Sequence, residues 1–248
     1  MLARHGVRHI ELTLRAGYVD LFDLGQLAFW KEAVVSGRIV AHSAHVYCDD
    51  VEPDLSSLNE DFRCRAVENV AARLDALASL ATRLVVIHGS NRPVVEDDRP
   101  ARLRWLQRSV GDLRAHARRH CVIIAVETMP FPHIPADQAE VLRVVEHCDP
   151  ECVGICVDTN HLNLSGDLLG AIARLGRRIV AFHLSDNDGQ EEKHWYPFEG
   201  VIDWKRVMRA IDETGYQGPL NFEFGMPEDL EADIRKRRQV FDRLMSLL

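Results

Sequence analysis

Short apolar runs alternate along the chain with longer segments in which apolar residues recur every three or four positions. The runs are rich in Val, Ile and Leu, as is typical of strands buried on both faces. The longer segments have the period of amphipathic helices, and some carry end signals such as Asp137 and Gly215. We expect strands at 7–12, 38–42, 83–89, 122–128, 153–161, 179–186 and 219–224, and helices at 24–36, 62–81, 100–119, 137–148, 167–176, 203–214 and 229–247.

Strands that alternate with helices predict a parallel sheet whose faces are covered by helices. Such a sheet is either doubly wound or closed into a barrel. No G-x-G-x-x-G or G-x-x-x-x-G-K-[ST] motif follows a strand, so a nucleotide-binding doubly wound sheet has no support. The 248 residues match the length of about 250 that is typical of a (β/α)8 barrel. We therefore expect an α/β fold of the TIM (β/α)8 barrel type.

The expected strands number one fewer than the eight of that barrel. The chain opens with what looks like the end of a helix, Leu2–His5 followed by Gly6, which leads straight into the first expected strand. This leaves open that the first strand of the barrel is absent. No flexible linker, low-complexity tract or repeat of roughly 20–50 residues divides the sequence, so residues 1–248 are expected to form a single domain.

The net charge and the hydropathy of the chain limit the classes of binding partner that we expect. The formal net charge is -8, so a nucleic-acid backbone would meet a repulsive field, and we expect a small neutral or metal-chelated substrate and no nucleic acid. Neither an apolar leader nor a long apolar span occurs, which predicts a cytoplasmic protein without a membrane partner. A homo-oligomer is compatible with the sequence, although no surface patch identifies one.

Ionisable residues lie at or near the end of every expected strand. In a barrel the carboxyl ends of the strands meet at one mouth, where active sites are built. Residues far apart in the sequence would therefore become neighbours. The residues in these positions are Glu11, His42, His88, Glu127, Asp158, His183 and Glu223.

Two of these carboxylates stand inside apolar runs that should be buried, Glu127 in VIIAVET and Glu223 in NFEF. A single acidic residue at a strand end is commonly a cap or solvated. A buried carboxylate, however, is costly unless it meets a cation or a metal. We therefore predict that Glu127, Asp158, His183 and Glu223 together hold a divalent metal ion. Manganese is expected first, with magnesium, cobalt and zinc as alternatives.

Motifs along almost the whole chain resemble one known family. The stretches GVRHIEL, LVVIHG, AVET, VDTNH, HLSDNDG and GPLNFEF occur in the order found in xylose isomerase-like barrels. That family includes sugar isomerases and epimerases and the endonuclease IV group. The most specific pieces are D-x-x-H at Asp158 and His161, H-x-x-D-N-D-G from His183, and the G-x-I-D-W-like segment from Gly200 to Trp204.

The resemblance implies roles for the strand-end residues. Glu127, Asp158, His183 and Glu223 would bind the metal, and Glu127 and Glu223 would also be the acid–base pair of an epimerase. Other positions would line the substrate pocket in sugar enzymes or hold additional zinc ions in the nucleases: His42, His88, His161, Glu192 and His194. Trp195 would form an apolar wall against a sugar or pack into the core.

The expected activity is isomerisation or epimerisation of a ketose or related keto-sugar by proton transfer through an enediolate. Alternatives are a lyase or dehydratase acting on a keto-sugar or cyclitol, an endonuclease IV-like zinc phosphodiesterase, and a non-catalytic sugar-binding barrel.

Two positions depart from the family pattern. Gly189 stands where many ketose epimerases carry arginine, and Phe198 where glycine is usual.

Overall fold

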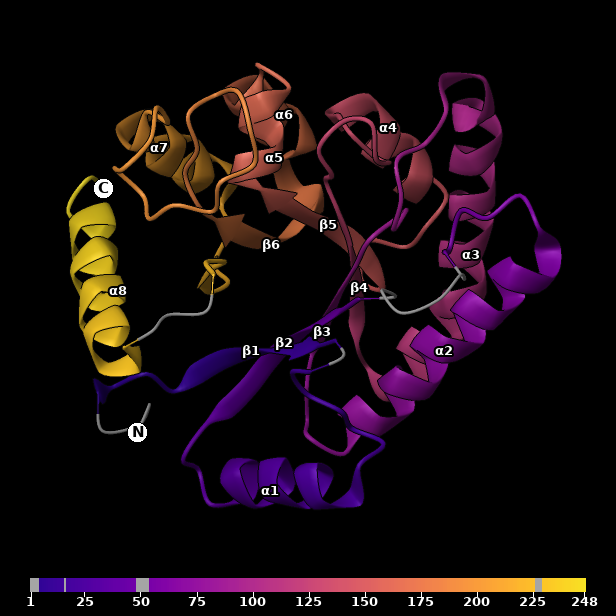
Figure 1. Cartoon of the computed structure of the whole chain (residues 1–248), viewed down its shortest axis with the longest axis horizontal. Coiled ribbons are helices and arrows are strands. Elements are labelled where there is room, and N and C mark those ends of the chain that lie inside the picture. Colours follow the sequence, from indigo (N-terminus) through magenta and orange to yellow (C-terminus); the bar gives the residue numbers. More distant parts are fainter. Residues whose placement is uncertain (1–4, 16, 48–53, 226–228) are drawn as a thin grey trace.

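The computed structural model describes residues 5–15, 17–47, 54–225 and 229–248, and these include seven parallel strands (Figure 1). The strands neighbour one another in chain order: β1 (His9–Leu14), β2 (Val40–Val46), β3 (Leu84–Ile87), β4 (Ile123–Glu127), β5 (Val153–Asp158), β6 (Ile179–Leu184) and β7 (Leu220–Phe222). The predicted TIM-like α/β barrel is confirmed, with seven strands in the described residues. The helix end expected at Leu2–His5 falls almost entirely outside the described residues.

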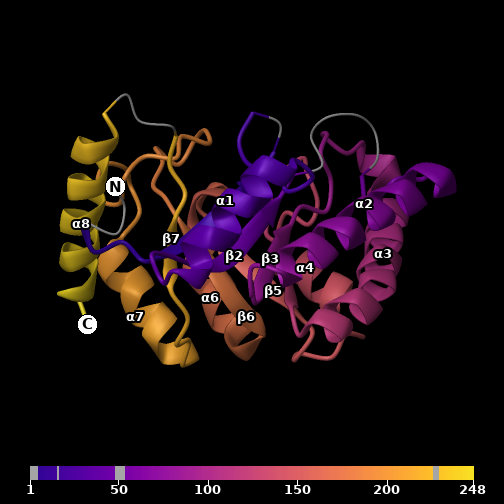
Figure 2. The same cartoon turned by 90° about the horizontal axis from the view of Figure 1, so that it is seen from below.

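Helices cover the outside of the sheet, as two views at right angles show (Figures 1 and 2). They are α1 (Leu24–Val35), α2 (Glu60–Ala78), α3 (Arg99–His120), α4 (Gln138–Val145), α5 (Thr159–Leu164), α6 (Leu168–Leu175), α7 (Trp204–Thr214) and α8 (Leu230–Met245), with single 3-10 turns η2 (Glu96–Asp98) and η3 (Gly176–Arg178). The strand predicted over 153–161 ends early, because the Asp158 side chain caps α5 by accepting from the His161 backbone N–H. No helix among the described residues has the length and apolar character needed to cross a membrane.

Side chains on the strands alternate between two apolar layers. Outward-facing residues, such as Val85, Ile124 and Ile155, join the helices in a large buried cluster. Inward-facing residues form a smaller cluster inside the barrel: Leu84, Val86, Ala125, Cys156 and Ala181. Glu127, Asp158 and His183 each lie two positions after one of the last three residues in this cluster. Because strand side chains alternate with period two, the same alternation directs these three toward the mouth of the barrel.

The barrel is nearly closed, with β1 and β7 as the two edges of the sheet. Among the described residues no backbone ladder joins these two strands. Side chains nevertheless meet across the gap, since Asn221 Nδ2 on β7 donates to Glu11 Oε1 on β1 at 2.8 Å. The two edges are therefore connected through the polar interior at the site.

The second strand differs from its prediction and displaces one predicted site residue. β2 continues four residues beyond the expected end at His42. A register shift pairs Ala41 with Ile10 and Ser43 with Glu11, so His42 is the extra residue of a bulge. His42 lines a cavity of about 490 Å³ with residues that precede the strands, such as Arg83 and Gly215. The structure thus places His42 toward the amino ends of the strands, apart from the residues at their carboxyl ends, and its predicted place in the substrate pocket stays a prediction.

Gly89, two residues after the end of β3, offers a test of the packing beneath the site. A Cβ added there would overlap with the Ile134 carbonyl oxygen and the Leu106 side chain. We expect Gly89→Ala to lower the free energy of unfolding by about 1–3 kcal/mol in urea denaturation. Gly111, inside α3 with open space around it, is the matched control, and Gly111→Ala should raise stability by about 0.5–1 kcal/mol. Equal effects of the two substitutions would contradict this packing.

Candidate metal centre

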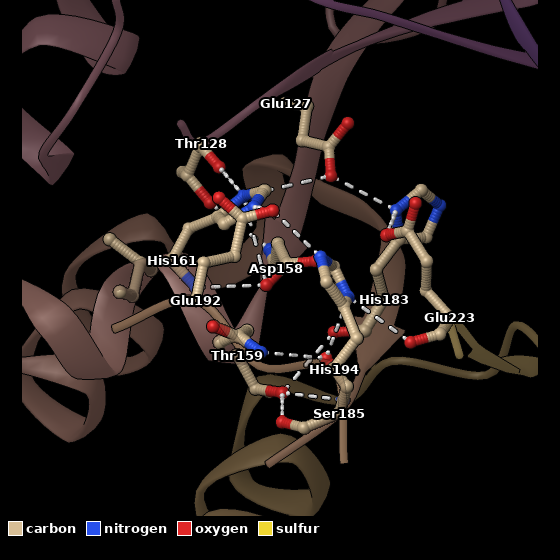
Figure 3. Close-up of polar contacts among 12 residues, drawn as sticks. Glu127, Thr128, Asp158, Thr159, His161, His183, Ser185, Glu192, His194 and Glu223 are labelled. Carbon is tan, nitrogen blue, oxygen red and sulfur yellow. Dashed lines mark hydrogen bonds and ion pairs between the residues drawn. The ribbon is translucent and has the colours of Figure 1, made fainter. Parts of the chain in front are cut away.

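The four predicted metal ligands converge at the carboxyl ends of β4 to β7 (Figure 3). One potential ligand atom from each of Glu127, Asp158, His183 and Glu223 lies within 4.8 Å of all the others. His183 Nδ1 lies 3.0 Å from Glu127 Oε1 and 2.9 Å from Glu223 Oε2. Three of the residues are fully buried, and the Glu223 side chain is 22% exposed. The arrangement presents one imidazole nitrogen and three carboxylates to a common point.

Unpaired oxygens at this point fit a bound cation. Glu127 Oε2, Asp158 Oδ2 and Glu223 Oε2 are buried and accept no well-aligned hydrogen bond, although histidine nitrogens lie 2.9–3.0 Å from the first and the third. Buried polar atoms are nearly always hydrogen-bonded, so three unsatisfied oxygens at one place need an explanation. A divalent ion held by one nitrogen and several carboxylate oxygens satisfies all three. The residues therefore fit the metal that the sequence predicts.

The electrostatics of the cluster point in the same direction. Burial opposes charge on His183, but the acidic groups around it, Cys156, Glu11, Glu223 and Glu127, outweigh burial and raise its pKa well above the usual value. Burial likewise favours a neutral Glu127, yet His183 and His45 hold its pKa well below the usual value. Burial raises the pKa of Asp158 to about 6. Without a metal, the buried carboxylates depend on protonated histidines for compensation.

A second group adjoins the first through Glu127. His45 Nε2 and His88 Nε2 each lie 3.0 Å from Glu127 Oε2 and 2.9 Å from one another. His88 was predicted, whereas His45 was missed in favour of His42. Tyr47 was missed as well, and its hydroxyl donates to Glu223 Oε1 at 2.9 Å. The period-two pattern of AHSAHV would have found His45, because it shares a strand face with Ser43 rather than with His42.

A third group lies on the other side of Asp158. His194 Nε2 is 2.8 Å from Glu192 Oε1, and His161 Nε2 is 3.6 Å from the same oxygen (Figure 3). Burial opposes charge on both imidazoles, but Asp158 and Glu192 outweigh it and raise the pKa of His161 to about 10 and that of His194 to about 9. Both histidines are therefore cationic at neutral pH in the metal-free protein.

The loop that carries Glu192 and His194 is organised by a buried carboxylate. Asp186 accepts hydrogen bonds from the backbone N–H groups of Asn187, Phe198 and Ile202 at 3.0–3.1 Å and from Trp204 Nε1 at 2.7 Å. Its own backbone pairs with that of Trp195. The Trp195 side chain is 37% exposed, so it is not part of the core. Its predicted contact with a sugar stays a prediction.

Comparison with known proteins is consistent with this geometry. The family described as xylose isomerase-like TIM barrel matches residues 1–244. The uncharacterized protein y4fM of Sinorhizobium fredii is 27% identical over 249 residues, which cover 91% of this chain and 79% of that protein. An inosose dehydratase of Geobacillus thermodenitrificans is 36% identical over 97 residues, but these cover only 32% of this chain and 33% of the dehydratase.

A solved structure extends the comparison to the whole fold. D-psicose 3-epimerase from Clostridium cellulolyticum, solved with D-tagatose, superposes with a TM-score of 0.82. The match covers 100% of this chain and 91% of the epimerase chain, at 20% sequence identity. At this identity the likeness shows the shared fold and leaves the substrate of this chain open.

The buried Asp186 carboxylate provides the test of the loop. Asp186→Ala would leave four buried donors without their acceptor, so we expect the free energy of unfolding to fall by more than about 2 kcal/mol and the 187–202 loop to become sensitive to limited proteolysis. Asp188 in the same loop is only half-buried, and among the described residues it accepts from the exposed Gln190 and Glu191 N–H groups. Asp188→Ala is thus the control, and the same protease pattern in both variants would refute the role of Asp186.

Proposed function

Because the chain belongs to the xylose isomerase-like TIM barrel family, we propose that it is a divalent-metal-dependent isomerase or epimerase of a ketose or related keto-sugar. One observation carries the proposal: two carboxylates from different strands, Glu127 and Glu223, lie on either side of His183 Nδ1 at 3.0 and 2.9 Å. Each has one buried oxygen without a well-aligned hydrogen bond. A metal ligand set and two bases are thereby combined in one place.

The metal, when bound, supplies a Lewis acid that polarises a substrate carbonyl and stabilises the negative charge that develops beside it. The chain's own residues move the proton. Isomerisation needs one carboxylate that takes a proton from one carbon and returns it to the neighbouring carbon. Epimerisation needs a second carboxyl group on the opposite face. Glu127 and Glu223 approach from β4 and from the end of β7, so they are the candidates for both.

The two carboxylates are held differently. Glu127 is fully buried between His45, His88 and His183, which fix both of its oxygens. Glu223 is partly exposed and is oriented by the Tyr47 hydroxyl. The histidines lower the pKa of Glu127, and His183 lowers that of Glu223, in both cases against the effect of burial. Both groups are therefore ionised at neutral pH and able to accept a proton.

Dehydration of a keto-sugar or cyclitol is the first alternative at the same site. Elimination needs an acid that protonates the departing hydroxyl group in addition to the base. His161 is such an acid, because it is cationic, almost fully buried and directly beside Asp158, whose Oδ1 accepts its backbone N–H at 2.9 Å. The partial similarity to an inosose dehydratase agrees with this alternative. Product analysis with an inosose and with ketohexoses would separate the two reactions.

Metal-assisted phosphodiester hydrolysis is the second alternative, and the ligand count is what favours it. The cluster of Glu127, Asp158, His183 and Glu223 adjoins His45 and His88 on one side, and His161, Glu192 and His194 on the other. Three ions could be held by these groups. If the protein binds two or three zinc ions per chain and cleaves a phosphodiester, hydrolysis would take the place of the sugar reaction as the proposed function.

Substitution of the proposed bases tests the sugar reaction. We expect wild-type protein to bind one divalent ion per chain, and Glu127→Gln and Glu223→Gln to weaken metal binding and lower turnover by about 10²–10⁴-fold. Elemental analysis and a panel of keto-sugars are the measurements. Glu199→Gln is the matched control, because Glu199 is exposed and pairs only with Lys236 at 2.6 Å. Full turnover by Glu127→Gln would remove Glu127 from the mechanism.

Metal binding should release a proton. His183 has a raised pKa in the metal-free protein, so it is protonated at pH 7 and must lose a proton before Nδ1 can bind an ion. Apparent metal affinity should therefore rise as the pH is raised toward the pKa of His183. Calorimetric titration at pH 7 in two buffers with different ionisation enthalpies measures the number of protons released. A value of zero would show that His183 is not a ligand.

A further inference from the structure

We propose that Glu11, one of the strand-end ionisable residues outside the four predicted ligands, is a positioning residue that turns the lone pair of His183 Nδ1 toward the metal. The inference rests on the proposed function, since it concerns how the same centre is held. Glu11 lies on β1, whereas His183 lies on β6, so neither is a sequence or sheet neighbour of the other. Glu11 Oε1 is 3.0 Å from His183 Nε2, the ring nitrogen that faces away from the carboxylate cluster.

The chemistry of imidazole makes this contact directional. A neutral imidazole carries one N–H and one lone pair, and an ionised carboxylate can only accept hydrogen bonds. His183 Nε2 has no well-aligned hydrogen bond in the structure, but Glu11 Oε1, 3.0 Å away, is the acceptor beside it, so we expect Nε2 to carry the hydrogen when Nδ1 binds an ion. The lone pair then lies on Nδ1, which faces Glu127 and Glu223. Carboxylates that orient ligating histidines in this way typically contribute 10–100-fold in metal affinity.

Glu11 is itself held by donors from two other strands. Ser43 on β2 donates to Oε2 at 2.7 Å, and Asn221 on β7 donates to Oε1 at 2.8 Å. The β2 bulge produces the first contact, because the register shift after Ile10 sets Ser43 opposite Glu11. The second contact spans the gap between the unpaired edges β1 and β7. The geometry of the gap is thus coupled to the orientation of His183.

The other group close to His183 is Cys156, which stands on β5 inside the barrel. Burial raises the pKa of its thiol. A thiol is a weak hydrogen-bond partner compared with a carboxylate. Glu11 is therefore the group that selects the tautomer.

Metal affinity of the full-length chain tests the proposal. We expect Glu11→Leu, which fills the same space without an acceptor, to raise the dissociation constant for manganese or zinc by about 10–100-fold in competition with a chelator. Glu11→Gln keeps one acceptor oxygen and should recover part of this loss. Glu199→Gln is the control for a change from carboxylate to amide outside the ligand clusters and should leave the constant unchanged. Thermal unfolding without metal reports whether each variant is folded.

The outcomes separate the role of Glu11 from the proposed function. A dissociation constant for Glu11→Leu equal to that of wild type overturns the proposal, and so does a Glu11→Gln variant as weak as Glu11→Leu, because an acceptor oxygen is then not what Glu11 supplies. Asn221→Ala provides a second variant if Glu11→Leu does not fold, and it should weaken binding in the same direction by less. No metal binding by wild-type protein would refute the proposed function itself, whereas wild-type binding with unaffected variants refutes only the role of Glu11.

Discussion

A concentration of buried carboxylates is the constraint on which the rest of the structure depends. Glu11, Glu127, Asp158 and Glu223 gather around the imidazole of His183, with His45, His88 and His161 beside them, inside a barrel that otherwise buries apolar side chains. Burying carboxylates without full compensation costs several kcal/mol per charge. The histidines compensate part of it, as the lowered pKa of Glu127 shows, but Asp158 keeps a raised pKa. A divalent cation completes the balance and at the same time provides the chemistry.

The barrel makes this concentration of charge possible through its alternation of inward and outward side chains. The outward residues pack the strands against the helices, so the position of the strands does not depend on the chemistry of their inward residues. Inward positions can then carry apolar residues in the middle of the barrel and ionisable residues at the carboxyl ends of the strands. Departures from regular pairing adjust the result, since the β2 bulge brings Ser43 opposite Glu11 and the cap at Asp158 ends β5 at a ligand.

Sequence reasoning reached the fold and the central ligands because both depend on local signals. Glu127, Asp158 and His183 end long apolar runs, and such runs show where a buried strand stops. His42 was chosen over His45 because β2 contains small polar residues and has no apolar run to mark its end. The role of Glu11 required the registers of β1, β2 and β7, which bring together residues up to 210 positions apart. Such long-range pairing leaves no signal in a single sequence.

The position of a bound ion tests the central claim most directly. Crystals of the protein grown with manganese, and measured at its absorption edge, would show where the ion sits by anomalous scattering. The structure predicts one strong peak that His183 Nδ1, Glu127, Asp158 and Glu223 all coordinate at about 2.0–2.3 Å. An empty cluster in crystals that contain manganese elsewhere, or a peak held without Glu127 and Glu223, would contradict the account.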